Sequence, residues 1–344
     1  MHRRVLIIRP DRIGDVVLTT PLIRSIRESF PDSFIGVMVH PSNVPLLKGN
    51  PHINVLLTDD PGGIDAGRRG FWKQVGNLRK HNFNVGLMPF PRERHAWMMS
   101  LAGISFRVGV GHKLYQMITF TRFVSRRKYI PLRHEAEYML DLGLKIGATF
   151  HTVTPRLYLT EEEKMIARSG LVSRGISFDK SVIAVNPLSR SSSPNWKPER
   201  YTELIERLLL RYSVIINLGP HEVERRALFS DVENLGAVVM SQPLRDHMAT
   251  VANCDLLISS STGSMHIAAA LRVPTLSLFC PLTACSPLLW GPLGNRSEVL
   301  LPAAGYCQQQ CPGDPKICPL DDIQVDQVIK QVVAVLSDEK RTRS

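Results

Sequence analysis

The chain has 344 residues, a formal net charge of +11 and 44% hydrophobic residues, a composition that excludes disordered, collagen-like and low-complexity proteins. A single core seldom organises a chain of this length, so we expect two domains. No apolar run approaches the roughly 18 residues of a membrane-spanning helix. The run Val5–Ile8 ends at Arg9 and predicts a strand rather than an export signal, so we expect a cytoplasmic protein.

The positive charge lies in the first half of the chain. Residues 1–160 carry 23 Lys and Arg against 11 Asp and Glu, whereas residues 161–344 carry 19 against 20. This distribution indicates an anionic partner such as a lipid surface, a phosphorylated substrate or nucleic acid, although a solvated basic surface has the same pattern. Nucleic acid is disfavoured, because the sequence has no zinc-finger spacing, RNP-type aromatic string or basic heptad helix.

Apolar runs alternate with helix-period segments in the first half. Runs bounded by Pro, Gly, Asp or Asn predict buried parallel strands at Arg4–Arg9, Phe34–Val39, Asn54–Leu57 and Asn84–Met88. Helical periodicity covers Val16–Phe30 and Glu135–Leu144. The alternation stops within 157–180, so we place the domain boundary there, with domains of residues 1–160 and 161–344. A C-terminal helix could pack back on the first domain.

The alternation restarts in the second half. The expected strands are Ser181–Val185, Ser213–Leu218, Asp255–Ser259 and Pro274–Phe279, and the expected helices are Pro198–Tyr212, His221–Phe229 and Ser264–Leu271. The loops after the first three strands are polar, hydroxyl-rich or contain glycine. Because ligands lie beyond the carboxyl ends of parallel strands, and phosphates bind at helix N-termini, we expect a diphosphate to fit this rim.

Several strings, in the same order along the chain, resemble glycosyltransferase family 9, the heptosyltransferases of lipopolysaccharide core assembly and their relatives. They are Arg12-Ile13-Gly14-Asp15, Thr20-Pro21-Leu22, Leu101-Ala102-Gly103-Ile104 with Arg107-Val108-Gly109, Trp196-Lys197-Pro198-Glu199-Arg200-Tyr201, Gly219-Pro220-His221-Glu222 and Thr262-Gly263-Ser264-Met265-His266-Ile267-Ala268-Ala269-Ala270. The resemblance implies the α/β GT-B architecture, in which two Rossmann-like domains with parallel sheets face a central cleft. It also implies an N-terminal acceptor-binding domain, a C-terminal nucleotide-sugar-binding domain, and inverting transfer without metal or cofactor. The sequence contains no Asp-x-Asp triplet, in agreement with that.

The resemblance also implies roles for individual residues. It makes Asp15 the general base, because deprotonating an acceptor hydroxyl requires a carboxylate within hydrogen-bond reach, and it places Arg12 and Gly14 in the acceptor site. The residues implied for donor binding are Thr262, Gly263 and His266 at the diphosphate, Glu222 at the ribose, and Ser261, Lys197 and Arg190 nearby. Structural alternatives exist: Asp15 and Glu222 could be first-turn helix carboxylates, and His266 a packed helix histidine.

Two positions depart from the family pattern. Members commonly have an acidic residue before Thr-Gly, where this chain has Ser261, and a lysine two residues before the Trp, where it has Pro194. The nearest cations are then Lys197 and Arg190. The resemblance implies ADP-heptose as donor, an anionic lipid-linked or lipopolysaccharide-core acceptor, and peripheral contact with the inner membrane leaflet.

The cysteines leave one motif unexplained. Cys307, Cys311 and Cys318 form C-x3-C-x6-C. A closed zinc site needs four ligands, and no fourth Cys or His lies nearby in sequence, so we expect a reduced, packed loop.

Two functions of different class remain: a glycosyltransferase, or a catalytically weak nucleotide-sugar or glycolipid binding protein on the same scaffold. A third possibility is another GT-B transferase or an epimerase that uses a UDP-sugar.

Overall fold

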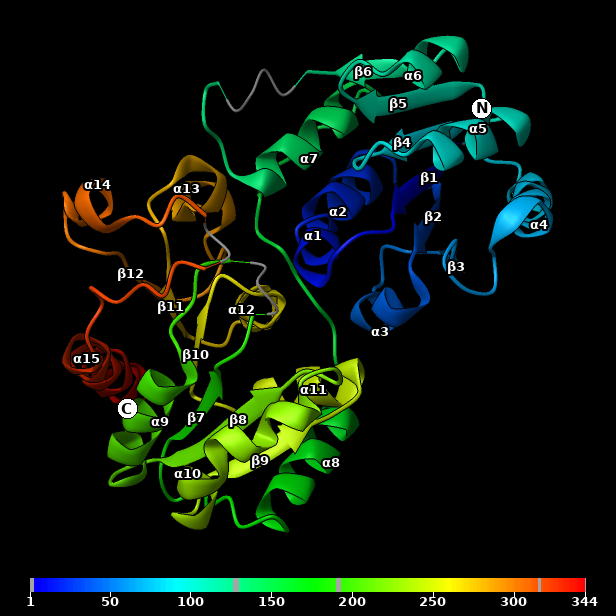
Figure 1. The fold of residues 1–344 in the computed structure, drawn as a ribbon. Helices are drawn as coiled ribbons and strands as arrows, with labels where there is room; N and C mark the ends of the chain where they lie inside the picture. The colour runs from blue at the N-terminus through cyan, green and yellow to red at the C-terminus, as the bar shows by residue number, and fades with distance from the viewer. Residues whose placement is uncertain (1–2, 126–129, 190–192, 315–316, 344) are drawn as a thin grey trace. The chain divides into compact units, whose positions relative to one another are not determined.

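Two parallel sheets of six strands organise the chain (Figure 1). The computed structural model describes residues 3–125, 130–189, 193–314 and 317–343, and the chain divides into two units, Met1–Tyr158 and Leu159–Ser344. The strands of the first unit are β1 Arg4–Arg9, β2 Phe34–Val39, β3 Val55–Thr58, β4 Val85–Met88, β5 Phe106–Val110 and β6 Arg122–Val124. Those of the second unit are β7 Val182–Asn186, β8 Ser213–Leu218, β9 Val238–Ser241, β10 Leu256–Ser260, β11 Thr275–Leu278 and β12 Ser297–Leu300.

The two sheets have the same topology. The strand order is β3-β2-β1-β4-β5-β6 in the first and β12-β11-β10-β7-β8-β9 in the second, which is the Rossmann order read from opposite ends. In such sheets the strand order reverses between the first and fourth strands, and ligands bind beyond the carboxyl ends at that point. The switch points here lie between β1 and β4 and between β7 and β10.

Helices connect the strands in both units. The first unit contains α1 Ile13–Val17, α2 Thr20–Ser29, α3 Val44–Leu47, α4 Gly67–Lys80, α5 Glu93–Leu101, α6 Leu114–Ile118 and α7 Glu135–Leu144. The second contains α8 Glu161–Val172, α9 Pro198–Leu209, α10 Ser230–Asn234, α11 Leu244–Val251, α12 Gly263–Ala270, α13 Pro287–Trp290, α14 Tyr306–Gln310 and α15 Val325–Arg343. None of the described helices is long and apolar enough to cross a membrane.

Two helix predictions differ from the structure. The single helix expected over Val16–Phe30 is instead α1 and α2, separated at Leu18 and Thr19. Pro21 explains the break, because a residue without an N–H fits the first turn of a new helix and not the interior of a long one. The helix expected over His221–Phe229 is a 3-10 helix, Val223–Phe229.

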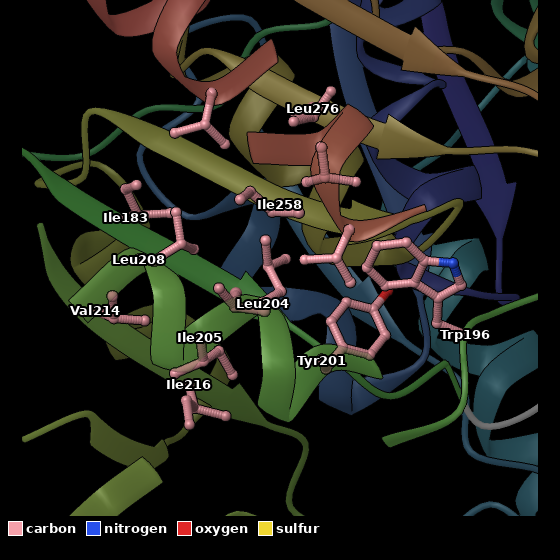
Figure 2. Close-up of a cluster of buried hydrophobic side chains, with 14 of the residues drawn as sticks. Ile183, Trp196, Tyr201, Leu204, Ile205, Leu208, Val214, Ile216, Ile258 and Leu276 are labelled. Carbon is pink, nitrogen blue, oxygen red and sulfur yellow. The ribbon is translucent and has the colours of Figure 1, made fainter. Parts of the chain in front are cut away.

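Apolar side chains from both faces of the second sheet form its core. Figure 2 shows one cluster, in which Trp196 lies next to Tyr201, with ring centroids 5.4 Å apart. The Trp196 indole donates to the Ile323 carbonyl (3.1 Å) and the Tyr201 hydroxyl donates to Asn195 Oδ1 (2.8 Å). These contacts fix the start of α9. The C-terminal helix α15 contacts α9, β11 and β12 of its own unit.

Candidate functional site

A buried arginine organises the first candidate site, at the carboxyl end of β1. Arg9 is 2% exposed, and its guanidinium contacts three carboxylates. Arg9 Nε lies 2.9 Å from Asp11 Oδ1, while Arg9 Nη2 lies 2.5 Å from Asp15 Oδ1 and 3.5 Å from Glu135 Oε1. Glu135 reaches this point from α7, distant in sequence. Three carboxylates around one guanidinium concentrate negative charge at the switch point of the first sheet.

This crowding affects the protonation of Asp11. The pKa of Asp11 is raised from 3.8 to about 6: burial raises it most, Arg9 lowers it, and the neighbouring Asp15 and Glu135 charges raise it. The Asp11 backbone carbonyl accepts a hydrogen bond from Asn43 Nδ2 at 2.7 Å, which ties the loop to the segment after β2. The site therefore contains a carboxyl group that titrates close to neutrality.

Asp15 forms an ion pair in this site. It lies in the first turn of the short helix α1, and its Oδ1 accepts a hydrogen bond from the Arg9 guanidinium. The N-cap of α1 is Arg12, which is exposed and makes no side-chain capping bond, and Gly14 is buried. Because Arg9 fixes one Asp15 oxygen and the side chain keeps partial exposure, a carboxylate is presented at the carboxyl edge of the first sheet.

The second candidate site lies where β10 gives way to α12. Thr262 is the N-cap of α12 and is 8% exposed, yet its hydroxyl has no hydrogen-bond partner among the residues that the structure describes. Ser261 is partly buried, and Gly263 begins the helix. The first N–H groups of a helix lack intrahelical acceptors and favour anions. An unpartnered buried hydroxyl and a helix N-terminus thus lie together at the switch point of the second sheet.

Two histidines accompany the first turns of α12. His266 is 5% exposed, and its backbone N–H donates to the Thr262 carbonyl at 3.4 Å. His247, on α11, has its Nε2 atom 3.0 Å from Ser264 Oγ. Burial lowers the pKa of His247 to about 4, so its ring is neutral at physiological pH. A neutral ring can accept from the Ser264 hydroxyl or donate to it.

Glu222 stabilises its own turn. It is 6% exposed, and its Oε2 accepts from the Gly219 N–H at 2.7 Å, while its backbone N–H donates to the Gly219 carbonyl at 2.8 Å. The carboxylate therefore has a local structural partner after β8, which is distinct from the helix-dipole role considered above. One carboxylate oxygen is used in this bond.

The loop after β7 contacts the end of β10, and β7 lies between β8 and β10. Ser193 Oγ lies 3.4 Å from Ser260 Oγ at the end of β10, and β7 pairs with both β8 and β10. The loops that carry Lys197, Glu222 and Thr262 therefore leave adjacent strands. Lys197 is exposed at the N-terminus of α9. Arg190 lies outside the described residues.

The cysteine loop has no metal geometry in the described part of the chain. All six cysteines are free thiols, and within the described ranges no three Cys, His, Asp or Glu side chains are grouped so that they could hold a metal ion. Burial raises the pKa of Cys280 to about 11, and the nearby thiols Cys285, Cys318 and Cys307 raise it as well. The Cys280 thiol is therefore protonated at neutral pH.

Comparison with known proteins identifies the family. The sequence model of glycosyltransferase family 9 (heptosyltransferase) matches residues 71–315, more than half of the chain. The chain belongs to this family. Lipopolysaccharide heptosyltransferase 2 of Salmonella typhimurium is 25% identical over 98% of this chain and 99% of its own length.

Solved structures resemble this family 9 glycosyltransferase over its whole length. A glycosyl transferase family 9 protein from Veillonella parvula superposes with a TM-score of 0.81 at 22% identity, covering 98% of this chain and 97% of the other. Escherichia coli ADP-heptose LPS heptosyltransferase II gives a TM-score of 0.79 at 21% identity, covering 98% and 99%. Together with the two sheets, these likenesses confirm the α/β class and the GT-B architecture.

Sequence reasoning missed four residues of these two sites. It did not identify Arg9, Asp11, Glu135 or His247 as site residues. The position of Arg9 at the end of an apolar strand was the one available sign of its role. A cation there is expected to be buried, and a buried cation requires anionic partners. Glu135 and His247 lie on helices far from the motifs, so only the folded chain brings them there.

Proposed function

We propose that this glycosyltransferase transfers a heptose or a related sugar from an ADP-sugar to a lipopolysaccharide-core or other lipid-linked acceptor, with inversion and without a metal ion. The observation that carries the donor half is the buried Thr262 hydroxyl, which lacks a partner among the described residues beside the N-terminus of α12. Leaving such a group unpaired is costly. A diphosphate oxygen would satisfy it, together with the free N–H groups of the helix.

The proposed reaction is a single displacement. The acceptor hydroxyl oxygen attacks the anomeric carbon of the donor sugar, the bond from that carbon to the diphosphate oxygen breaks, and the nucleoside diphosphate leaves with the bonding electrons. Asp15 takes the hydroxyl proton, with Arg9 holding its carboxylate in place. Arg12 and Gly14 belong to the acceptor side. Thr262, Gly263 and His266 stabilise the charge that develops on the leaving diphosphate.

The donor's remaining contacts are assigned to the neighbouring loops. Lys197 is exposed and available for the diphosphate, and Arg190 is proposed for the same role. Glu222 binds the ribose through the carboxylate oxygen that Gly219 does not use. Ser261 replaces an acidic residue next to the sugar, which makes the diphosphate the main point of donor recognition.

The names of the relatives support the choice of donor and acceptor. The Escherichia coli structure is named for ADP-heptose, and the Salmonella typhimurium protein for lipopolysaccharide. The net positive charge of residues 1–160 suits an acceptor that bears phosphate groups and lies in the cytoplasmic leaflet of the inner membrane. We therefore propose a cytoplasmic enzyme that contacts this leaflet peripherally.

A thermal-shift screen tests the donor. The protein is heated with ADP, UDP, ADP-heptose and UDP-sugars, because a ligand present at 100 times its dissociation constant stabilises by about 2.7 kcal/mol. We expect ADP and ADP-heptose to raise the melting temperature, followed by release of ADP when a lipopolysaccharide-core acceptor is added. Stabilisation by UDP ligands alone would point to a UDP-sugar enzyme. Stabilisation by ADP-heptose without turnover on any core acceptor would point to the binding protein.

A further inference from the structure

An exposed apolar surface covers the edge of the first sheet. It consists of α6, the turn that follows and β6, which Figure 1 places at the sheet end beyond β5. Within ten residues, five large apolar side chains are exposed: Leu114 (73%), Met117 (71%), Ile118 (53%), Phe120 (84%) and Phe123 (46%). Single exposed apolar residues are ordinary, but such a concentration marks an interaction site. We name these five residues the edge surface.

The same segment buries three uncharged polar side chains. Gln116 is 2% exposed, Thr119 1% and Thr121 7%. Gln116 accepts from the Lys113 N–H at 2.8 Å and donates to the Val110 carbonyl at 3.3 Å. A helix on a protein surface normally directs its apolar side to the core and its polar side to water. Here the two sides are exchanged.

A buried arginine holds the segment in this orientation. Arg107 is 9% exposed, and its Nε donates to the Thr119 carbonyl at 2.9 Å. The same guanidinium also donates to the Ile104 carbonyl, so it links the C-terminal end of α6 to the loop before β5. The hydroxyls of Thr119 and Thr121 are 2.9 Å apart. These hydrogen bonds therefore fix the backbone that carries the exposed apolar side chains.

Phe120 is also strained. Its φ is +50°, in the left-handed region that bulky side chains rarely adopt. Strain of this kind persists where surrounding structure imposes it, and it gathers at functional positions. The result is an aromatic ring, 84% exposed, at the turn between α6 and β6.

We propose that the edge surface is where this protein docks on a lipid bilayer with anionic headgroups. Protruding apolar side chains suit insertion between lipid chains, and basic side chains beside them suit the phosphates. Lys113 and Arg122, both exposed, flank the apolar residues, and residues 1–160 carry the chain's excess of positive charge. The inference rests on the proposed function, because a lipid-linked acceptor lies at such a surface.

Vesicle binding of the full chain tests the proposal. Sedimentation is measured with vesicles of phosphatidylcholine alone and with about 30 mol% phosphatidylglycerol. We expect wild type to bind the anionic vesicles. Phe120→Ser and the double variant Leu114→Ser/Met117→Ser should each have at least about tenfold lower vesicle affinity, because each apolar side chain buried in the bilayer contributes at least that factor. Ile64→Ser is the matched control: Ile64 is 75% exposed in the same unit, outside the edge surface.

A second measurement does not depend on loss of binding. Phe120→Trp keeps an aromatic ring at the tip, and vesicles with brominated acyl chains should quench its fluorescence beyond that of wild type. Equal vesicle binding by wild type and both serine variants, or no added quenching, would overturn the proposal. So would a dimer that Phe120→Ser dissociates while vesicle binding stays unchanged, which would make a second copy the partner.

The enzymatic assay separates this inference from the proposed function. Phe120→Ser should keep wild-type turnover on a delipidated, water-soluble core acceptor. If vesicle binding follows the edge surface but no acceptor is glycosylated, the docking inference stands and the proposed reaction fails. If transfer proceeds and the edge-surface variants bind vesicles as wild type does, the reaction stands and the docking inference fails.

Discussion

The two sheets share one topology and differ at their carboxyl edges. At the first switch point a buried arginine collects carboxylates, and one of them, Asp11, has a pKa raised to about 6 by burial. At the second, the groups are the Thr262 hydroxyl, which has no partner among the described residues, helical N–H donors and a neutral His247. One edge is suited to accept a proton and the other to bind an anion. The same strand order therefore supports different chemistry through the loops that it carries.

Removing the carboxylate of Asp15 should have the largest effect. Asp15→Asn should lower turnover by about 10²–10⁴-fold if Asp15 is the proposed base, because such a group acts on the acceptor in the transition state. ADP affinity should stay within about twofold of wild type, since the proposed donor site lies in the second unit. Initial rates of ADP release and calorimetric titration with ADP measure the two. Asp32→Asn, an exposed carboxylate of the same unit, is the control, and wild-type turnover in Asp15→Asn would remove Asp15 from the mechanism.

The next prediction concerns Thr262 at the carboxyl edge of the second sheet. Thr262→Val keeps the side-chain shape and removes the unpartnered hydroxyl, so the melting temperature without ligand should be unchanged or higher. ADP affinity should fall by about 10–100-fold, the equivalent of a hydrogen bond to a charged group. Thr250→Val is the control: the Thr250 hydroxyl already donates to Gln242 Oε1 at 2.9 Å, so that variant should lose stability and keep ADP affinity. Unchanged ADP binding by Thr262→Val would contradict the assignment.

A smaller effect tests whether recognition centres on the diphosphate. Lys197→Ala should weaken ADP and the intact ADP-sugar equally, by about tenfold, through loss of one charge-assisted hydrogen bond. With Ser261 in place of a carboxylate, ADP and the ADP-sugar should bind wild type within about tenfold of each other. Lys180→Ala, an exposed lysine just before the amino end of β7 and so away from the carboxyl edge of the sheet, should change neither. A donor that binds a hundredfold tighter than ADP would mean that other groups recognise the sugar.

The last prediction concerns stability and the titration of Asp11. Its pKa rises from 3.8 to about 6 on folding, so the folded chain holds this proton more tightly than the unfolded chain. The stability that protonated Asp11 contributes is complete below about pH 4 and is lost as the pH rises through about 6. Asp11→Asn cannot ionise, so relative to wild type it should gain about 1–3 kcal/mol between pH 4 and pH 7. Calorimetric melting at both pH values checks this, and an equal difference at both would refute the shift.

The sequence predicted the elements that are buried on both faces. The strands Arg4–Arg9, Phe34–Val39 and Ser213–Leu218 have the expected bounds, because a central parallel strand is a continuous apolar run between polar residues. Strands β5, β6, β9 and β12 were not predicted. Three of them, β6, β9 and β12, lie at sheet edges and have only three or four residues, so their apolar runs are too short to stand out from loops.

The candidate sites were predictable only where a motif carries them. The strings around Asp15 and Thr262 follow strands and can be read locally. The contact of Arg9 with Glu135, and of His247 with Ser264, depends on which helices pack together. The edge surface was not predictable either. Helical periodicity predicts that the apolar side of α6 faces the core, whereas in the structure Gln116 and the neighbouring Arg107 are buried and the apolar side is exposed.

The left-handed conformation of Phe120 has a consequence for protein engineering. Glycine adopts a φ of +50° without steric conflict, so Phe120→Gly should tolerate heating as well as wild type or better, by roughly 1 kcal/mol or less. A library selected for heat resistance in free solution would therefore enrich glycine at this position. Such a selection would discard the most exposed ring of the edge surface without any loss in the property being selected. Thermostable variants of this enzyme should accordingly be chosen in the presence of membranes.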